Sequence, residues 1–171
     1  LHDALPILFG LMFGGFGGPG GNAEENRLPV WIIDEEETPI TESVISFLET
    51  SEVVNVETKS PDIELADLKQ AVVDEDVTGV IFFHEGFSET VRSENTANFN
   101  VILDENTPVG ITLKRTIQTA ANRLETAAKA ADRAVGFYSE KEGFANESEK
   151  ETFYETSLQE ALAAWDTPPV I

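Results

Sequence analysis

The chain has 171 residues, and its 11 lysines and arginines are outnumbered by 32 aspartates and glutamates, which gives a formal charge of −21 at pH 7. A field of this sign repels phosphate backbones, so the composition excludes a protein that binds nucleic acid through a basic surface. The chain also has no cysteine, which excludes disulfides, thiolate metal sites and thiol nucleophiles.

The first charge-free segment, residues 4–23, approaches the length of about 20 residues that a helix needs to cross a bilayer. Glycines fill its second half, and each disfavours a helix by about 1 kcal/mol, so we expect a helix only as far as about Phe13. Because the chain begins at Leu1 rather than Met, we predict that residues 1–23 are the end of a transmembrane helix followed by a Gly-rich linker. A secretory signal peptide and a soluble glycine-rich linker are the alternatives.

All the basic residues and 31 of the acids follow Ala23, and residues 24–171 suit one domain with a core of its own. Short runs of β-branched and aromatic residues alternate there with runs of helical periodicity. We predict strands at 29–34, 53–58, 79–84 and 99–104, helices at 39–50, 61–74, 108 to about 138 and 149–166, and a short helical turn near 87–92.

Hydroxyl residues followed by proline mark three of the predicted helix starts. Thr38-Pro39, Ser60-Pro61 and Thr107-Pro108 each combine a side chain that can cap a helix with a residue suited to its first turn. Ser148 to Glu151 has the spacing of a capping box that opens the last helix.

Strands that alternate with helices predict an α/β fold with a mixed, mainly parallel four-stranded sheet, flanked by helices. Right-handed crossovers favour the strand order 2-1-3-4. The direction of the fourth strand stays open, because its connection is only about a dozen residues long, the lower limit for a crossover.

The helix that starts at Pro108 keeps its apolar residues at a 3.5-residue period, which is typical of a seam against another helix. The last helix is acidic and the long one is rich in lysine and arginine, so we expect the two to pack and to pair their charges. Residues 108–166 are therefore predicted to form a long C-terminal helical hairpin.

Residues at strand ends are the candidates for contact with a ligand or partner: Asp34, His84, Phe87 and Asp104. Phosphate-binding glycine loops and a nucleophile elbow do not follow any predicted strand. We interpret the acids as turn and helix-start residues and predict no metal site, although a Ca²⁺ or Mg²⁺ site at Asp34 and Asp104 is the alternative if their strands are parallel.

The uncharged start followed by Leu28 to Asp34 (LPVWIID) is similar to the first transmembrane helix and first extracytoplasmic strand of ABC-2 type transporter permeases. Residues 67–88, with the Gly86-Phe87 turn, and residues 100–104 before the long helix resemble the elements that follow in that family. The likeness runs from about residue 4 to 135. His84-Glu85 departs from it, since the family often has a proline there.

The resemblance implies an export permease in the cell membrane, whose extracytoplasmic α/β domain would be residues 24–171. It implies as partners the membrane, other permease segments or a second permease subunit, and a cytoplasmic nucleotide-binding subunit that hydrolyses ATP. The chain itself would then be no enzyme and would hold no cofactor.

The sequence leaves two other classes of function open. A membrane-anchored solute-binding or sensor domain would share the fold and the membrane segment. A small α/β hydrolase or a metal-dependent enzyme would need a cleft with convergent polar groups, and the sequence shows no pattern that predicts one.

Overall fold

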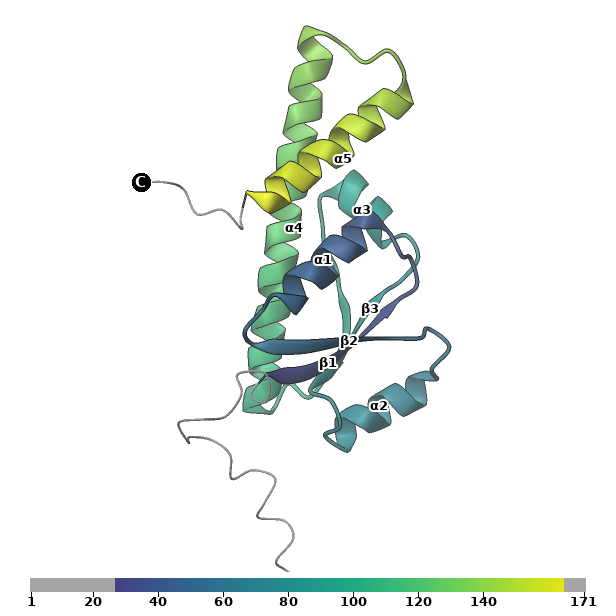
Figure 1. Ribbon diagram of the computed structural model, residues 1–171, viewed down its shortest axis with the longest axis vertical. Coiled ribbons are helices and arrows are strands. Elements are labelled where there is room, and N and C mark those ends of the chain that lie inside the picture. The colour runs from purple at the N-terminus through teal and green to yellow at the C-terminus, as the bar shows by residue number, and fades with distance from the viewer. Residues whose placement is uncertain (1–26, 165–171) are drawn as a thin grey trace, which may run out of the picture.

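The computed structural model describes residues 27–164, so the predicted membrane segment lies outside the described part. A four-stranded sheet in the order β2-β1-β3-β4 forms its centre (Figure 1). The predicted α/β class and strand order are confirmed. The elements along the chain are β1 Leu28–Asp34, α1 Pro39–Glu49, β2 Val54–Lys59, α2 Leu65–Val73, β3 Gly79–Phe83, α3 Phe87–Glu94, β4 Asn100–Leu103, α4 Pro108–Lys141 and α5 Glu147–Ala163.

The structure decides the direction of the fourth strand. β1 pairs in parallel with both β2 and β3, whereas β4 is antiparallel to β3, with Gly79 opposite Leu103 and Phe82 opposite Asn100. Half of the connection between β3 and β4 is used by the eight residues of α3. An antiparallel strand can start at the carboxyl end of β3, so the chain does not have to return to the amino end of the sheet.

Successive side chains along the strands point to opposite faces of the sheet and pack into two hydrophobic cores, one on each face. The larger core lies under α1, α3 and α4, and its strand residues are Val30, Ile32, Val54, Ile81 and Phe83. The smaller core lies under α2 and contains Ile33, Leu68, Ala71, Val77 and Val80. A parallel pair buried on both faces explains why β1 and β3 read as continuous apolar runs.

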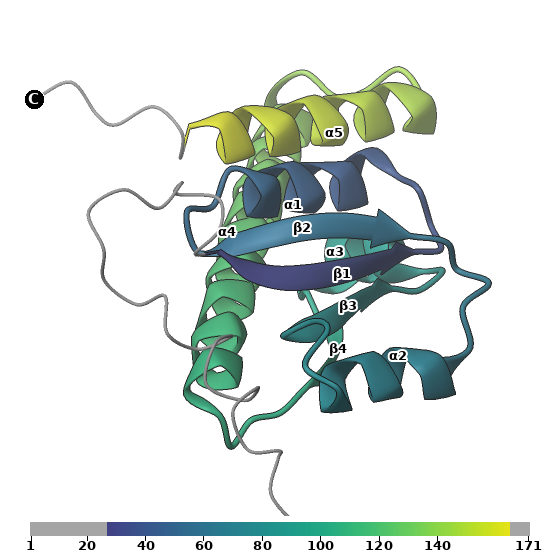
Figure 2. The same ribbon diagram turned by 60° about the horizontal axis from the view of Figure 1, so that its bottom comes forward.

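Helix α4 has 34 residues, about 50 Å at 1.5 Å per residue. Its first half packs on the sheet, and its second half rises beyond the sheet and pairs with α5, which runs back over α1 (Figures 1 and 2). Three aromatic rings close the far end of this hairpin, with centroids 4.8 to 5.5 Å apart: Tyr138, Phe144 and Phe153. The predicted packing of the two helices is thus confirmed.

Two of the predicted helix starts are confirmed by their caps. Thr38 and Thr41 form a reciprocal capping box at the start of α1, and the hydroxyl of Thr107 accepts from the Gly110 amide at the start of α4. The other two are wrong.

Ser60 does not cap α2. Its hydroxyl accepts from the Asp62 amide in a turn, and the helix begins at Leu65. The last helix begins earlier than predicted, because Asn146 accepts from the Glu149 amide and replaces Ser148 as the cap.

The expected charge pairing between the two long helices takes a different form. Lys129 pairs with Glu125 in its own helix, and Glu155 of α5 pairs with Arg92 of α3. In the described part of the chain, the α4–α5 hairpin is therefore stabilised mainly by apolar and aromatic contacts.

We expect Tyr154→Phe to raise the free energy of unfolding by about 1 kcal/mol, since an unsatisfied buried hydroxyl costs about 1 to 3 kcal/mol. Tyr154 is 8% exposed, and within residues 27–164 its hydroxyl has no hydrogen-bond partner. Burial first, and then the charge of Asp132, raise the pKa of Tyr154 above 10.0, while Arg92 lowers it.

Because this pKa is raised on folding, ionisation of the phenol leaves the free energy of unfolding unchanged below about pH 10 and lowers it as the pH rises through the folded-state pKa. Urea unfolding of both proteins at neutral pH and above pH 10 measures the two effects. A variant that is less stable than the parent at neutral pH would contradict the assignment.

Candidate functional site

The carboxyl ends of β1 and β3 lie side by side, because the two strands are parallel and Asp34 is opposite Phe83. Asp34 is only 8% exposed. One of its carboxylate oxygens accepts from the Thr41 hydroxyl at 2.7 Å, and the other accepts from the amides of Glu36 and Glu37 at 3.1 and 3.0 Å. The side chain thus closes the turn that leads into α1.

Glu36 joins this turn to the start of α3. Its carboxylate accepts from the amides of Gly86 and Ser88, at 3.1 and 3.0 Å, and from the Ser88 hydroxyl. The hydroxyls of Ser88 and Thr38 are 2.6 Å apart. A carboxylate at a helix N-terminus interacts favourably with the free amides and the helix dipole, so Glu36 occupies the place that an anionic ligand would take.

Sequence reasoning missed the role of Glu36 and Ser88. The sequence shows both the acidic run after the first strand and the Gly86-Phe87-Ser88 turn. However, Glu36 and Ser88, which contact each other, are separated by 52 positions along the chain. The predicted parallel pairing of β1 with β3 could have indicated this contact, since it places the two turns side by side at the carboxyl ends of the strands.

His84 and Phe87 have different surroundings although both follow β3. The ring of His84 is half exposed, stacks on Phe82 and places Nδ1 2.8 Å from a carboxylate oxygen of Glu35. Phe87 is 8% exposed and packs its ring 5.1 Å from that of Phe83. Phe87 is therefore a core residue, and His84 is the one that faces outward.

Asp104 lies at the amino ends of β1 and β3, whereas Asp34 lies at their carboxyl ends. The reason is that β4 is antiparallel and ends beside Gly79, the first residue of β3. Its carboxylate accepts from the amide and the side-chain nitrogen of Asn106, at 2.9 and 3.1 Å. The condition for a shared Asp34–Asp104 metal site, parallel strands, is thus not met. Residues 27–164 contain no group of three or more acidic or histidine side chains placed to hold a metal ion.

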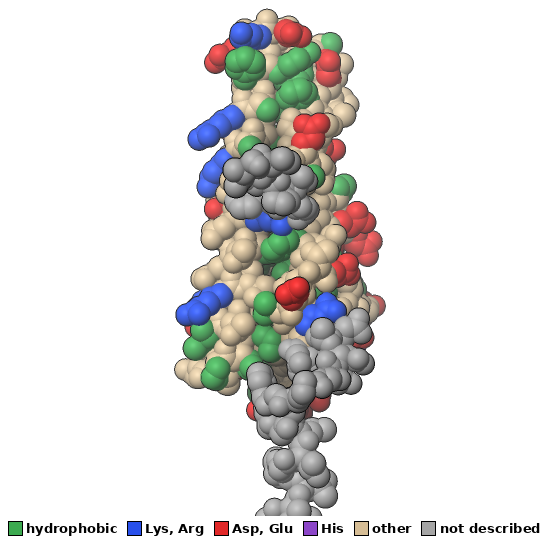
Figure 3. All heavy atoms as spheres, turned by 60° about the vertical axis from the view of Figure 1, so that its left-hand side comes forward, with side chains coloured by type: hydrophobic (Ala, Val, Ile, Leu, Met, Phe, Trp, Pro, Cys, Tyr) green, Lys and Arg blue, Asp and Glu red, His purple; other side chains and the backbone are tan. Residues whose placement is uncertain are grey.

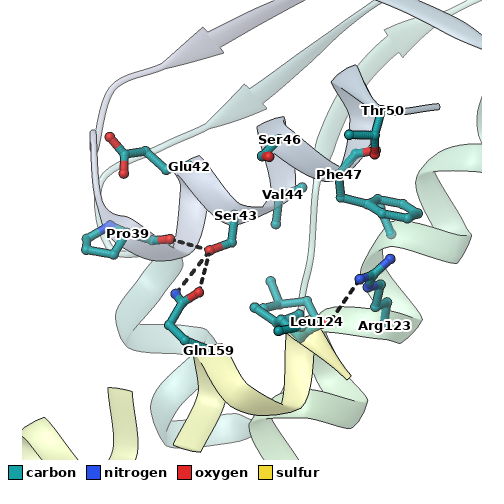
Figure 4. Close-up of a pocket in the computed structure, with 13 residues that line it drawn as sticks. Pro39, Glu42, Ser43, Val44, Ser46, Phe47, Thr50, Arg123, Leu124 and Gln159 are labelled. Carbon is teal, nitrogen blue, oxygen red and sulfur yellow. Dashed lines mark hydrogen bonds between the residues drawn. The ribbon is translucent and has the colours of Figure 1, made fainter. Parts of the chain in front are cut away.

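A groove of about 700 Å³ lies between α1, α4 and α5 (Figure 4). Val44 and Leu124 line it, and the Arg123 guanidinium lies 4.5 Å from the centroid of the Phe47 ring. Arg123 also donates to the Leu162 carbonyl at 2.8 Å. The groove therefore combines an apolar lining with one cationic group that is already engaged.

At the other end of the same groove, Ser43 and Gln159 join α1 to α5. The Ser43 hydroxyl donates to the Pro39 carbonyl at 2.7 Å, and the Gln159 side-chain nitrogen donates to the Ser43 hydroxyl at 3.0 Å (Figure 4). These bonds fix the hairpin on the α/β layer. Glu42, Ser46 and Thr50 of α1 also line the groove.

The first described strand begins and the last described helix ends on the same side of the molecule (Figures 1 and 2). A chain of contacts connects the two points: Arg27 donates to the Ser51 carbonyl just after α1, and Arg123 bridges Phe47 of α1 and Leu162 of α5. Seen from this side, most of the basic side chains lie toward the left and most of the acidic ones toward the right, although both kinds also occur elsewhere on this face (Figure 3).

The sequence matches the family described as ABC-2 family transporter protein over residues 4–162. The chain belongs to this family. The match continues past residue 135, where the resemblance seen in the sequence alone ends, and includes most of the hairpin of α4 and α5. The chain is accordingly part of a membrane transporter.

Comparison with curated proteins and with solved structures finds no match. In residues 27–164, every helix is too short or too polar to cross a membrane.

Proposed function

We propose that this chain is an extracytoplasmic α/β domain of an ABC-2 export permease, preceded by the end of its first membrane helix in residues 1–23. The domain is non-catalytic and contributes to export that a separate ATPase subunit drives. Its partners are the membrane, the remaining permease segments or a second permease subunit, and a nucleotide-binding subunit across the membrane.

The observation that carries this proposal is the position of the two ends of the described fold. β1 begins and α5 ends on one side, so a domain inserted between two membrane segments can stand on the membrane with that side toward it (Figure 2). Membership of the transporter family supports a place beside the membrane. In the proposal, the charge-free residues 4–23 form the neighbouring membrane segment.

The polar groups of the described part support a non-catalytic role. The carboxylate oxygens of Asp34 and Glu36 accept hydrogen bonds from turn amides and hydroxyls. A triphosphate needs an array of free amides with a lysine, and Glu36 already fills the amides at the start of α3. The formal charge of −21 adds repulsion of nucleotides.

We expect deletion of residues 24–165 from the intact permease to impair export while the partner subunit keeps its ATP binding. The reason is that the proposed site of hydrolysis lies on another chain, across the membrane from this domain. Transport assays and nucleotide binding on the purified complex measure the two quantities, and the complex with the intact domain is the control. Saturable ATP binding by this chain alone, or export that is unchanged by the deletion, would refute the proposal.

A further inference from the structure

Strand β4 leaves one edge of the sheet without a partner strand. It is the last strand in the order, and no backbone hydrogen bond in the described part joins Asn100 to Leu103 to anything but β3. Amide and carbonyl groups on its outer side can thus pair with an added strand.

The two free edges of the sheet differ in how they are protected. β2, at the other edge, carries Glu57 and Lys59, which pair with each other, and charged side chains of this kind discourage an added strand. β4 carries no charge along its four residues, Asn100 to Leu103. The β4 edge is therefore the more receptive of the two.

A groove of about 350 Å³ runs beside β4 and is walled by α4. Val101 and Leu103 turn toward this face, where they pack on the larger core, and Ile117 and Ala121 of α4 line the opposite wall. An exposed edge beside a helix-walled apolar groove gives main-chain pairing and pockets for alternate side chains in one place.

The acidic group at the end of β4 and the formal charge of −21 of the whole chain favour a cationic occupant. Lys114 and Glu105 line the groove and pair with each other at 2.8 Å, so these two residues leave the groove without net charge. Asp104, directly after β4, has no cationic partner in the described part of the chain, and its carboxylate accepts only from Asn106.

We propose that the β4 edge binds an extended cationic segment of another polypeptide, which adds a fifth strand to the sheet. Its apolar side chains enter the groove between β4 and α4, and a basic side chain lies near Asp104. A second copy of this chain is the poorer occupant, because two chains of formal charge −21 repel each other. The proposal rests on the edge and its charges and is independent of the direction or substrate of transport.

The test uses the 171-residue chain in nonionic detergent and a capped peptide of alternating lysine and valine. We expect saturable binding and slower hydrogen exchange at the β4 amides, with exchange in β2 unchanged. The same peptide N-methylated at alternate residues keeps its charge but loses strand pairing, so it should bind about tenfold more weakly or worse. A peptide with glutamate in place of lysine should also bind at least about tenfold more weakly.

Three variants locate the site. Asp104→Asn should weaken binding severalfold, and Gln118→Trp, which fills the groove from an exposed position of α4, should abolish it. Asn55→Trp on the exposed edge of β2 is the matched control and should leave binding unchanged. Equal binding of the N-methylated peptide, protection of β2 instead of β4, or a β4-protected dimer without peptide would each overturn the proposal.

Discussion

Replacing Gly110 by alanine is expected to lower the free energy of unfolding by about 2 to 4 kcal/mol, in the upper range of overpacked substitutions. A Cβ at this position would lie 1.9 Å from the Asp104 carbonyl oxygen and 2.9 Å from the Thr107 hydroxyl that caps the helix. Neither group can move without breaking the turn that carries the chain from β4 into α4.

Gly136→Ala in the same helix is the matched control, because a Cβ there meets no atom within 4 Å. Alanine is favoured over glycine by about 0.8 to 1.0 kcal/mol inside a helix, so this variant should be more stable than the parent. Urea unfolding of the three proteins gives the comparison. Stabilisation by Gly110→Ala would contradict the close approach of Gly110 to the Asp104 carbonyl.

Glu36→Ala is expected to cost about 1.5 to 3 kcal/mol, the range for hydrogen bonds to a charged group. The substitution removes the carboxylate that accepts from the amides of Gly86 and Ser88 and from the Ser88 hydroxyl. Both the cap of α3 and the link between the two strand-end turns are lost. Hydrogen exchange at the first turn of α3 should therefore quicken along with the loss of stability.

Glu35→Ala, one position earlier, is the control for charge alone. Glu35 pairs with the half-exposed ring of His84, and exposed ion pairs contribute about 0 to 1 kcal/mol. Thermal unfolding of the two variants should separate them clearly. Equal losses in both would mean that the acidic turn acts through its overall charge rather than through the Glu36 contacts.

Local patterns predicted the parts of the fold that local physics controls. The hydroxyls of Thr38 and Thr107 cap their helices, and each threonine is followed by a proline that fits the first turn. Ser60-Pro61 has the same pattern and fails, since the Ser60 hydroxyl satisfies the Asp62 amide in a turn and α2 starts at Leu65. The pattern states which residues are able to cap a helix, and competition from a nearby amide decides whether they do.

Tertiary pairing controls what the sequence left open. The direction of β4 depends on whether the chain crosses the sheet after α3. The side-chain pattern of residues 84–99 does not predict whether it does. The same choice moves Asp104 away from Asp34. The link between Glu36 and Ser88 likewise follows from the neighbourhood of β1 and β3, not from any short motif.

The location of this domain on the outer side of the membrane is the central claim, and single-cysteine labelling tests it most directly. These 171 residues contain no cysteine, so Ser139→Cys, at an exposed position near the end of α4, introduces a single site into the domain once any cysteines elsewhere in the permease are replaced by serine. Ala128→Cys, at a position that is 0% exposed, is the control and should react only after denaturation. The account predicts that a membrane-impermeant maleimide labels Ser139→Cys in intact cells, and labelling only after the cells are opened would contradict it.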